Sequence, residues 1–194
     1  MTNLYKIEEL KNLGVTVYGK NIFISKFVNI YNPTNLILHD NIRIDDFSII
    51  SCKGIIEIFN FVHISAHCFI SSATQIKIHN YSAISVGTKI FGACDDFSGD
   101  FLVNPTIPKK FLNVKIGDVI IKEHVVIGSN SVIMPDIIIN QGVAIGACSF
   151  VNKNCNPWKI YAGSPIRFIK NRNNNCLNLQ KELENEIENN KFVF

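Results

Sequence analysis

Two closely spaced histidines, His63 and His67 in the segment FVHISAHC, are the side chains best suited to proton transfer at neutral pH. A pair of carboxylates, Asp95 and Asp96 in CDDFSGD, is the second candidate, because carboxylates orient a histidine or bind a hydroxyl or an ammonium. Each group has a structural alternative. The histidines could lie at a subunit interface, and the Asp pair could cap the backbone of its own turn.

The stretch from Val119 to Val151 indicates the architecture that must position these residues. Read in sixes it runs VIIKEH, VVIGSN, SVIMPD, IIINQG, VAIGAC and SFVNKN, with an aliphatic residue at the third place of each six. A period of six matches neither a helix, at about 3.6 residues per turn, nor a simple strand, at about 2. It is typical of a parallel β-helix, in which each six forms a short strand and a corner and points one aliphatic side chain inward.

The same pattern begins near Asn21 with a longer coil. Aliphatic positions there are separated by six or eight residues in a fixed order, so each coil takes twenty residues. These inward positions are Ile24, Ile30, Leu38, Ile44, Ile50, Ile58, Ile64, Ile70, Ile78, Ile84 and Ile90. Small residues recur two places before one column, at Ser48, Cys68 and Thr88, where we expect tight corners. By alternation, His63 points outward because Ile64 points inward.

One segment interrupts the repeat. Phe91–Val114 contains Pro105, Pro108 and the Asp pair, and it has no place in the six-residue rhythm. We predict a protruding loop between two coils at about 91–114. A loop of this length inside a regular fold is usually functional.

The two ends of the chain are expected to close the β-helix of residues 21–170. Residues 1–20 predict an N-terminal cap with a short helix at Tyr5–Leu13, which places Leu10 and Leu13 on one face and ends at Gly14. Residues 171–194 predict a linker and an acidic amphipathic helix at Leu177–Asn189. We expect this α-helix to pack along the β-helix or against a neighbouring subunit.

Three further histidines are expected to be structural. His39 and His79 each follow a core residue of the same column, so they should stack above one another at a corner. His124 lies in the corner KEH between two late coils.

Composition excludes several classes of protein. The net charge of +3 does not favour binding to nucleic acid, and no apolar run is long enough to span a membrane. The first fourteen residues lack the apolar stretch of a secretory signal, so we expect a cytoplasmic protein. The six cysteines have no metal-binding spacing and are expected to be free thiols.

The six-residue repeat, the mid-chain loop and the ending IYAGSPIR together resemble the hexapeptide-repeat acyltransferases over about residues 20–170. The segments DDFSGD, NPTIPKKF and PWKIYAGSP are similar to those of sugar acetyltransferases of surface-polysaccharide pathways such as O-antigen synthesis. Some of these acetylate the amine of thymidine-diphosphate-linked (dTDP) 4-amino-4,6-dideoxyglucose. The resemblance implies a left-handed β-helix and a homotrimer with active sites between subunits. It also implies acetyl-CoA as donor and a nucleotide-linked amino sugar as acceptor.

In that family the pantetheine arm of acetyl-CoA lies in a groove between subunits and bonds to backbone groups of the later coils. The positions that match this pattern are Ser129, Ala147, Asn152, Lys153, Arg167 and Lys170, with the last four towards the adenosine end. Arg and Lys suit phosphate groups. The alternative is that the small residues only form corners and the cations are solvated. For Arg167, in AGSPIR, we favour the ligand.

Acyl transfer needs a base that deprotonates the attacking group, and we assign this role to His63, with His67 in reserve. The sugar O-acetyltransferases of the family carry their catalytic histidine at the start of the excursion, where this chain has Asp95. Their mechanism therefore does not transfer unchanged. The Asp pair suits an amine acceptor, which favours N-acetylation over O-acetylation.

Three alternatives stay open. A sugar O-acetyltransferase would share the fold and the donor. A non-catalytic structural hexapeptide protein would not bind acetyl-CoA. A γ-class carbonic anhydrase also shares the fold but needs three metal-binding histidines, and the histidines of this sequence show no such set, so we expect no metal.

Overall fold

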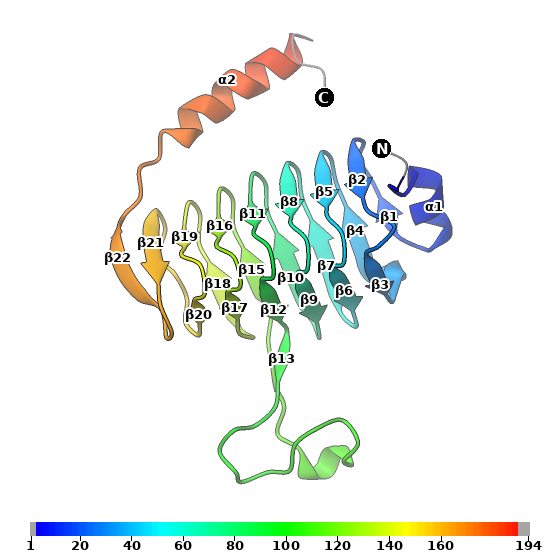
Figure 1. The fold of residues 1–194 in the computed structure, drawn as a ribbon, viewed down its shortest axis with the longest axis vertical. Helices are drawn as coiled ribbons and strands as arrows, with labels where there is room; N and C mark the ends of the chain where they lie inside the picture. Colours follow the sequence, from blue (N-terminus) through cyan, green and yellow to red (C-terminus); the bar gives the residue numbers. More distant parts are fainter. Residues whose placement is uncertain (1–2, 190–194) are drawn as a thin grey trace.

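The computed structural model describes residues 3–189, which form a left-handed parallel β-helix with one projecting loop and one projecting helix (Figure 1). Short strands from successive coils lie side by side in three parallel sheets, because each coil repeats the inward aliphatic pattern of the coil before it. The prediction of an all-β hexapeptide-repeat β-helix is confirmed.

Each sheet takes one strand from each coil. The first sheet contains β1 (Thr16–Val17), β4 (Leu36–Leu38), β7 (Ile55–Ile58), β10 (Gln75–Ile78), β15 (Val119–Ile121) and β18 (Ile137–Ile139). The second contains β2 (Ile22–Ile24), β5 (Ile42–Ile44), β8 (Val62–Ile64), β11 (Ala83–Ile84), β16 (Val126–Ile127), β19 (Ala144–Ile145), β21 (Lys159–Ala162) and β22 (Arg167–Asn171). The third contains β3 (Asn29–Tyr31), β6 (Ile49–Cys52), β9 (Phe69–Ser72), β12 (Lys89–Phe91), β17 (Val132–Ile133) and β20 (Phe150–Val151). We call the turn from the first sheet to the second the first corner, the next turn the second corner, and the turn back to the first sheet the third corner.

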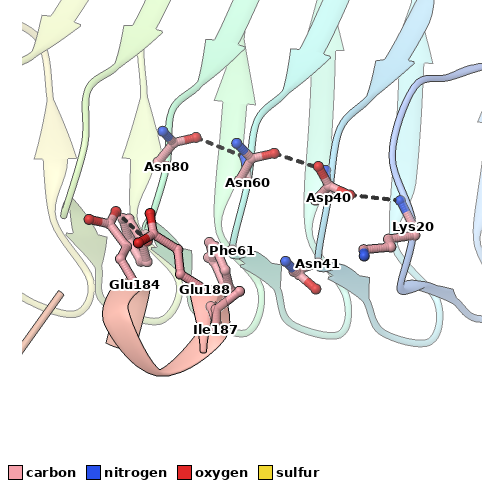
Figure 2. A pocket seen from close by; sticks show the side chains of 10 residues that line it. Lys20, Asp40, Asn41, Asn60, Phe61, Asn80, Glu184, Ile187 and Glu188 are labelled. Carbon is pink, nitrogen blue, oxygen red and sulfur yellow. Dashed lines mark hydrogen bonds between the residues drawn. The ribbon is translucent and has the colours of Figure 1, made fainter. Parts of the chain in front are cut away.

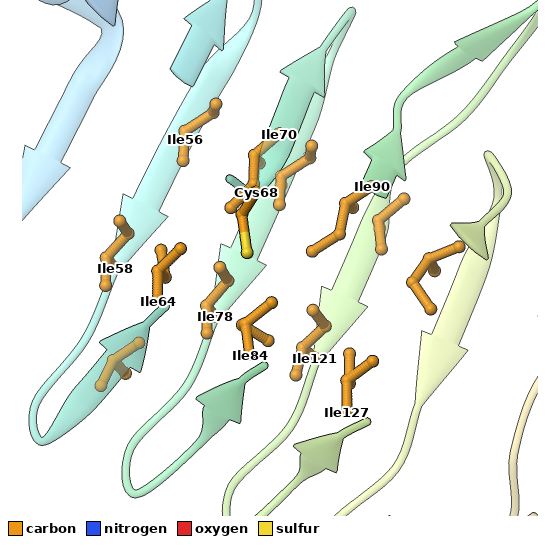
Figure 3. Close-up of a cluster of buried hydrophobic side chains, with 14 of the residues drawn as sticks. Ile56, Ile58, Ile64, Cys68, Ile70, Ile78, Ile84, Ile90, Ile121 and Ile127 are labelled. Carbon is orange, nitrogen blue, oxygen red and sulfur yellow. The ribbon is translucent and has the colours of Figure 1, made fainter. Parts of the chain in front are cut away.

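The core is a set of aliphatic columns in register (Figure 3). Leu38 pairs with Ile58 and Ile58 with Ile78, which confirms the twenty-residue coil. After the loop, Ile121 pairs with Ile139, so the coil shortens to eighteen residues. Every predicted inward residue is buried except Ile30, which packs against the core while partly exposed.

Small polar residues complete the second corner from the inside. Ser48, Thr88 and Ser131 are fully buried, and Cys68 almost so. The hydroxyl of Ser48 donates to the carbonyl of Ser65 at 3.0 Å and accepts from the N–H of Cys68 at 3.1 Å. The predicted tight corner is therefore also where buried backbone groups find partners.

The predicted excursion is a loop that leaves the third corner and projects away from the coils (Figure 1). Its stem is a two-stranded antiparallel ribbon of β13 (Ala93–Cys94) and β14 (Lys115–Ile116), and it contains the 3-10 turn η2 (Lys109–Phe111). The chain re-enters the wall at β15, so the excursion extends a few residues beyond the predicted end at Val114.

The N-terminal segment covers the first coil. Helix α1 (Ile7–Asn12) buries Leu10 completely, whereas Leu13 is 46% exposed, so the predicted pairing of these two leucines on one face is wrong. Gly14 follows with a φ of +97°, as a helix stop requires. Leu4 forms an antiparallel bridge with Ser25, which covers the outer edge of β2. A second 3-10 turn, η1 (Pro33–Asn35), precedes β4.

The C-terminal end reverses direction before its helix begins. Strand β22 runs antiparallel to β21 and ends the second sheet. Arg172 then donates from Nη1 to the carbonyls of His124 and Gly142, at 2.8 and 3.1 Å, which ties the linker to the first corner. Helix α2 (Cys176–Glu188) runs back over the coils and buries none of its residues fully (Figure 1). Of the predicted 171–194 segment, residues 190–194 lie outside the described residues.

Candidate active site

His63 lies on β8 and points out of the wall of the second sheet. Its Nε2 lies 2.7 Å from Oδ2 of Asp45, and the Nε–H of Arg43 donates to the other oxygen of that carboxylate at 2.7 Å. These side chains come from successive coils, because Arg43 pairs with His63 in the register of β5 and β8. The side chain of His63 is 45% exposed, so a ligand can reach the ring.

Asp45 is the residue that orients His63. Partial burial raises the pKa of the Asp45 carboxyl, but hydrogen bonds from His63 and Arg43 outweigh burial and lower that pKa below its usual value. An ionised carboxylate at this distance fixes the orientation of an imidazole and stabilises its protonated form. With Nε2 directed at Asp45, Nδ1 is the nitrogen left to accept a proton from a substrate.

The loop carboxylates do not contact His63 within the chain. Asp96 accepts hydrogen bonds from the N–H of Ser98 at 2.7 Å and from its hydroxyl at 2.8 Å, and these bonds lower the pKa of Asp96. Asp96 therefore caps its own turn, as the structural alternative expected. Asp95 is exposed, and its carboxylate forms no hydrogen bond or ion pair within residues 3–189.

His67 occupies the second corner of the same coil. Its ring stacks on Phe47 with centroids 5.2 Å apart, and Phe47 stacks on Phe27 at 5.5 Å. We call Phe27, Phe47 and His67 the second-corner ladder. All three rings are exposed to solvent. Sequence analysis did not identify this ladder, although its members are spaced by twenty residues.

The other three histidines lie in ring stacks, and His39 and His79 share a column as predicted but do not stack on each other directly. His39 and His79 stack through Phe59, with centroid distances of 4.8 and 4.6 Å. His124 stacks on Tyr81 at 5.2 Å and its Nε2 lies 2.6 Å from Oε1 of a glutamine on α2. These rings all belong to the first corner.

The residues assigned to the donor form two groups. Ser129 and Ala147 lie on successive coils at the second corner, each preceded by a glycine. A Cβ on either glycine would collide with the next coil, so the wall there presents mostly backbone and small side chains. We call this the small-residue strip: Gly128, Ser129, Gly146, Ala147, Ala162 and Gly163.

The four residues assigned to the adenosine end, three of them cationic, lie at both edges of the last coils. Arg167 is on β22 and pairs with Ala162, so it adjoins the small-residue strip, and Lys170 follows on the same strand. Asn152 and Lys153 follow β20 at the third corner, at the opposite edge of the third sheet. All four side chains are exposed.

Two cavities lie apart from His63 and from the residues assigned to the donor. An apolar cavity of about 480 Å³ lies between the loop stem and the third sheet, lined by Phe91, Ala93, Cys94, Phe97, Met134 and Phe150. A polar cavity of about 340 Å³ lies under α2 at the first corner (Figure 2). There Asn80, Asn60, Asp40 and Lys20 form a ladder of hydrogen bonds, in which each side-chain oxygen accepts from the backbone N–H of the preceding coil. This ladder tightens the corner.

Within residues 3–189, no three His, Cys, Asp or Glu side chains gather so as to hold a metal ion. No helix in that range is long and apolar enough to cross a membrane.

Comparison with known proteins identifies close relatives. Residues 118–153 match the family model described as bacterial transferase hexapeptide (six repeats). The chain is 34% identical over 173 residues to the dTDP-4-amino-4,6-dideoxy-D-glucose acyltransferase of Escherichia coli, covering 89% of this chain and 90% of that protein.

Solved structures agree with that match. AntD, an N-acyltransferase from Bacillus cereus in complex with dTDP and 3-hydroxybutyryl-CoA, is 41% identical, with a TM-score of 0.93 over 97% of this chain and 100% of that chain. A hexapeptide-repeat acetyltransferase from Vibrio cholerae complexed with acetyl-CoA is 15% identical, with a TM-score of 0.62 over 89% of this chain and 81% of that chain. The second likeness concerns the fold alone.

Proposed function

This chain belongs to the hexapeptide-repeat acyltransferases that transfer an acyl group from a coenzyme A thioester to a sugar, and from that premise we propose that it N-acetylates a dTDP-linked amino-dideoxy sugar. The observation that supports this most is the match to the Escherichia coli acyltransferase over nine-tenths of both chains. The AntD complex, which contains both dTDP and an acyl-CoA, supports the same pair of substrates.

The proposed mechanism uses His63 as the base. The amine of the acceptor attacks the thioester carbon, and Nδ1 of His63 takes the proton, directly or through one water. Asp45 stabilises the imidazolium that forms, because it already lies 2.7 Å from Nε2. The tetrahedral intermediate then collapses, the C–S bond breaks, and His63 returns the proton to the coenzyme A thiolate. The products are an amide and free coenzyme A.

The donor is proposed to lie along the small-residue strip. Its amide-bearing pantetheine arm suits a wall of backbone groups at Ser129 and Ala147, because no large side chain blocks the approach. Arg167 adjoins the strip and, with Lys170 on the same strand, supplies charge for the phosphates. Asn152 and Lys153 lie at the opposite edge of the third sheet and are proposed to meet the adenosine there.

We propose that the active site is completed by a neighbouring subunit in a homotrimer. The loop projects away from its own coils and exposes apolar side chains that a partner surface would cover: Phe97, Phe101, Leu102, Val103 and Phe111. Asp95 lies in this loop, and its unpaired carboxylate suits the ammonium of an acceptor bound to the partner. Asp96 shapes the turn that presents it.

The proposed setting follows from the substrates. Acyl-CoA thioesters and nucleotide sugars are cytoplasmic metabolites, and all six cysteines are free thiols. We therefore propose a cytoplasmic enzyme that supplies acetylated sugars for O-antigen or a related surface polysaccharide.

The test is release of coenzyme A thiol from acetyl-CoA, with mass spectrometry of the product. The acceptor panel contains dTDP-4-amino-4,6-dideoxyglucose, its 3-amino and galacto isomers, and simple galactosides. We expect rapid turnover of one nucleotide amino sugar with a mass gain of one acetyl group. Turnover only of unlinked sugars would show a sugar O-acetyltransferase instead. Absence of any binding of acetyl-CoA in a thermal-shift assay would contradict the proposal and favour a structural role.

A further inference from the structure

The apolar cavity of about 480 Å³ takes its walls from two parts of the chain. One wall comes from β12, the loop stem and the loop, and the other from the third sheet after the loop. Its lining residues are Phe91, Ala93, Cys94 and Phe97 on the first wall, and Met134 and Phe150 on the second. None of these side chains offers a strong hydrogen bond, so a group that occupies the cavity has to be apolar itself.

The one thiol in the lining stays uncharged. Burial raises the pKa of the Cys94 thiol and the neighbouring Asp95 raises it as well, whereas Lys115 lowers it by less. The thiol is therefore protonated at neutral pH and acts as a small apolar group. A thiol with a raised pKa is also a poor nucleophile, so Cys94 suits the wall of a site better than a covalent role.

The stem is held to the β-helix at its base. The N–H of Gly92 donates to the carbonyl of Ser71 at 2.7 Å, and the N–H of Gly117 donates to the carbonyl of Gly92 at 3.1 Å. A Cβ on Gly92 would lie 2.7 Å from a backbone nitrogen just after β9, so a glycine is needed for this close approach. Farther out, Asp96 caps its own turn. The stem therefore holds the cavity open in a fixed shape.

Asp95 stands between two residues that line the cavity. Cys94 precedes it, and Phe97 follows two positions later. The carboxylate of Asp95 is the group that we propose for the ammonium of the acceptor. The acceptor amine attacks the thioester carbon, so these two atoms are in contact when they react. The rest of the acyl chain must then lie near Asp95, where the cavity supplies apolar walls.

Phe97 leaves one side of the cavity open in the single chain. Its side chain is 88% exposed, whereas the other lining residues are partly buried. A neighbouring subunit that covers the loop would cover this side too. In such a closed cavity each additional buried methylene strengthens binding about fourfold, and the methyl of an acetyl group leaves most of the space unused.

We infer that this cavity holds the acyl chain of the donor, so that the enzyme prefers coenzyme A thioesters with chains of four or more carbons to acetyl-CoA. This inference rests on the proposed function and changes only the acyl group. The amide C–N bond forms, the C–S bond breaks and free coenzyme A leaves, as with acetyl-CoA. Met134, with its flexible thioether, lets the wall adapt to chains of different length.

The experiment uses the full chain and steady-state kinetics with acetyl-, butyryl- and hexanoyl-CoA. The acceptor is the nucleotide amino sugar that acetyl-CoA acylates fastest. We expect kcat/KM for butyryl-CoA to exceed that for acetyl-CoA about tenfold, because two more methylenes are buried. Titration with the same thioesters in the absence of acceptor should show the same order of affinity.

Two substitutions should move the chain-length preference in opposite directions. Ala93→Phe fills the cavity from the stem, so the preference for butyryl-CoA should be lost. Phe150→Ala enlarges the cavity from the wall, so hexanoyl-CoA should become the best donor. The matched control is Ile116→Phe, which adds a ring to the stem residue paired with Ala93. Ile116 is 53% exposed and is not among the lining residues, so this variant should keep the donor preference of the unaltered enzyme.

The outcomes separate this inference from the proposed function. If the unaltered enzyme uses acetyl-CoA at least as well as butyryl-CoA, the inference is overturned and the proposed function stands. An equal loss of activity with all donors in Ala93→Phe overturns it too, because a filled acyl site should penalise the longer chains most. Absence of turnover with every donor and every nucleotide sugar overturns the proposed function as well. If Ala93→Phe melts at a lower temperature, Ala93→Val adds less volume and should still reduce the preference for butyryl-CoA.

Discussion

The N-terminal and C-terminal coils share one core but present different second corners. The coils before the loop take twenty residues each, and the first three carry Phe27, Phe47 and His67 at that corner. The coils after it take eighteen residues and carry small or short side chains there. The inward columns continue through both halves without a break. The core therefore keeps the coils in one register, and the second corner distinguishes the two halves. It carries stacked rings in the N-terminal half and small side chains in the C-terminal half.

The third corner also distinguishes the two halves. The two additional residues of each N-terminal coil lie there, and the projecting loop is inserted at the same corner between β12 and β15. The additions leave the register of the wall intact, because Ile78 still pairs with Ile121 across the loop. A loop can thus project from the wall without disturbing the core that holds His63.

The largest expected effects test whether the two halves share one core. Ile64→Ala and Ile127→Ala each remove a fully buried side chain from the same column, one from each half. We expect each to lower the free energy of unfolding by about 2–5 kcal/mol, measured by urea denaturation. An exposed control, Ile55→Ala on the outside of β7, should cost far less. A large effect in only one half would show that the halves are not equally packed.

The next largest effect tests His63, the proposed base, which lies on β8 in the N-terminal half. His63→Ala should lower kcat about a hundredfold or more with acetyl-CoA binding retained, because a positioned general base contributes at least that much. Asp45→Asn should lower kcat less and shift the pH profile, since it leaves the imidazole in place without its carboxylate. Near-normal turnover by a folded His63→Ala variant would make His63 an interface residue.

A smaller effect tests the donor half. Ala147→Trp places a large side chain on the small-residue strip, and we expect the KM for acetyl-CoA to rise about tenfold, because pocket shape controls ligand approach. Binding of dTDP, measured by titration, should not change. An unchanged KM for acetyl-CoA would show that the donor does not lie on the strip.

The smallest effect concerns acid sensitivity, which should belong to the N-terminal half. Burial lowers the pKa of His79 and outweighs the attraction of Glu123, whose Oε1 lies 3.6 Å away; Lys122 and Lys77 lower the pKa further, while Glu57 raises it. Because the folded pKa lies below the unfolded one, the unfolded state binds more protons as the pH falls. Stability should therefore be unaffected above about pH 7 and should decline below the ordinary histidine pKa of about 6.5.

His79→Phe tests this directly. The ring stack with Phe59 is preserved, but the titratable group is removed. Melting temperatures between pH 7 and pH 5 should fall less for this variant than for the unaltered protein. An equal fall would assign the acid sensitivity to other groups.

Much of the fold follows from the sequence, because a six-residue period allows few structures and fixes which side chains point inward. The outward direction of His63 and the shared column of His39 and His79 follow from the same rule, whereas the Phe59 ring between those two histidines was not anticipated. Leu13 departs from its expected face because the helix is only six residues long and ends before a full second turn can bury it. The loop could be located but not shaped, since its backbone depends on local caps such as Asp96 with Ser98.

The site was harder to predict than the fold. Asp45 was not predicted as the partner of His63, because the twenty-residue register pairs His63 with Arg43 and Asp45 lies two positions further along the chain. The stacking of Phe47 on His67 depends on how side chains of two coils meet, and no single segment encodes it. Asp95 lies in the loop, outside the six-residue repeat, so no periodic pattern indicates which group its carboxylate faces.

Both ends of the second sheet are closed by segments that run antiparallel to the wall: the Leu4–Ser25 bridge at one end and β22 at the other. In a parallel β-helix each coil forms backbone hydrogen bonds with the edge of the coil before it. An uncovered end coil would present the same unpaired edge to another molecule. A reversed strand cannot continue that series. These two short segments give the molecule a definite length and keep it from growing end to end into a filament.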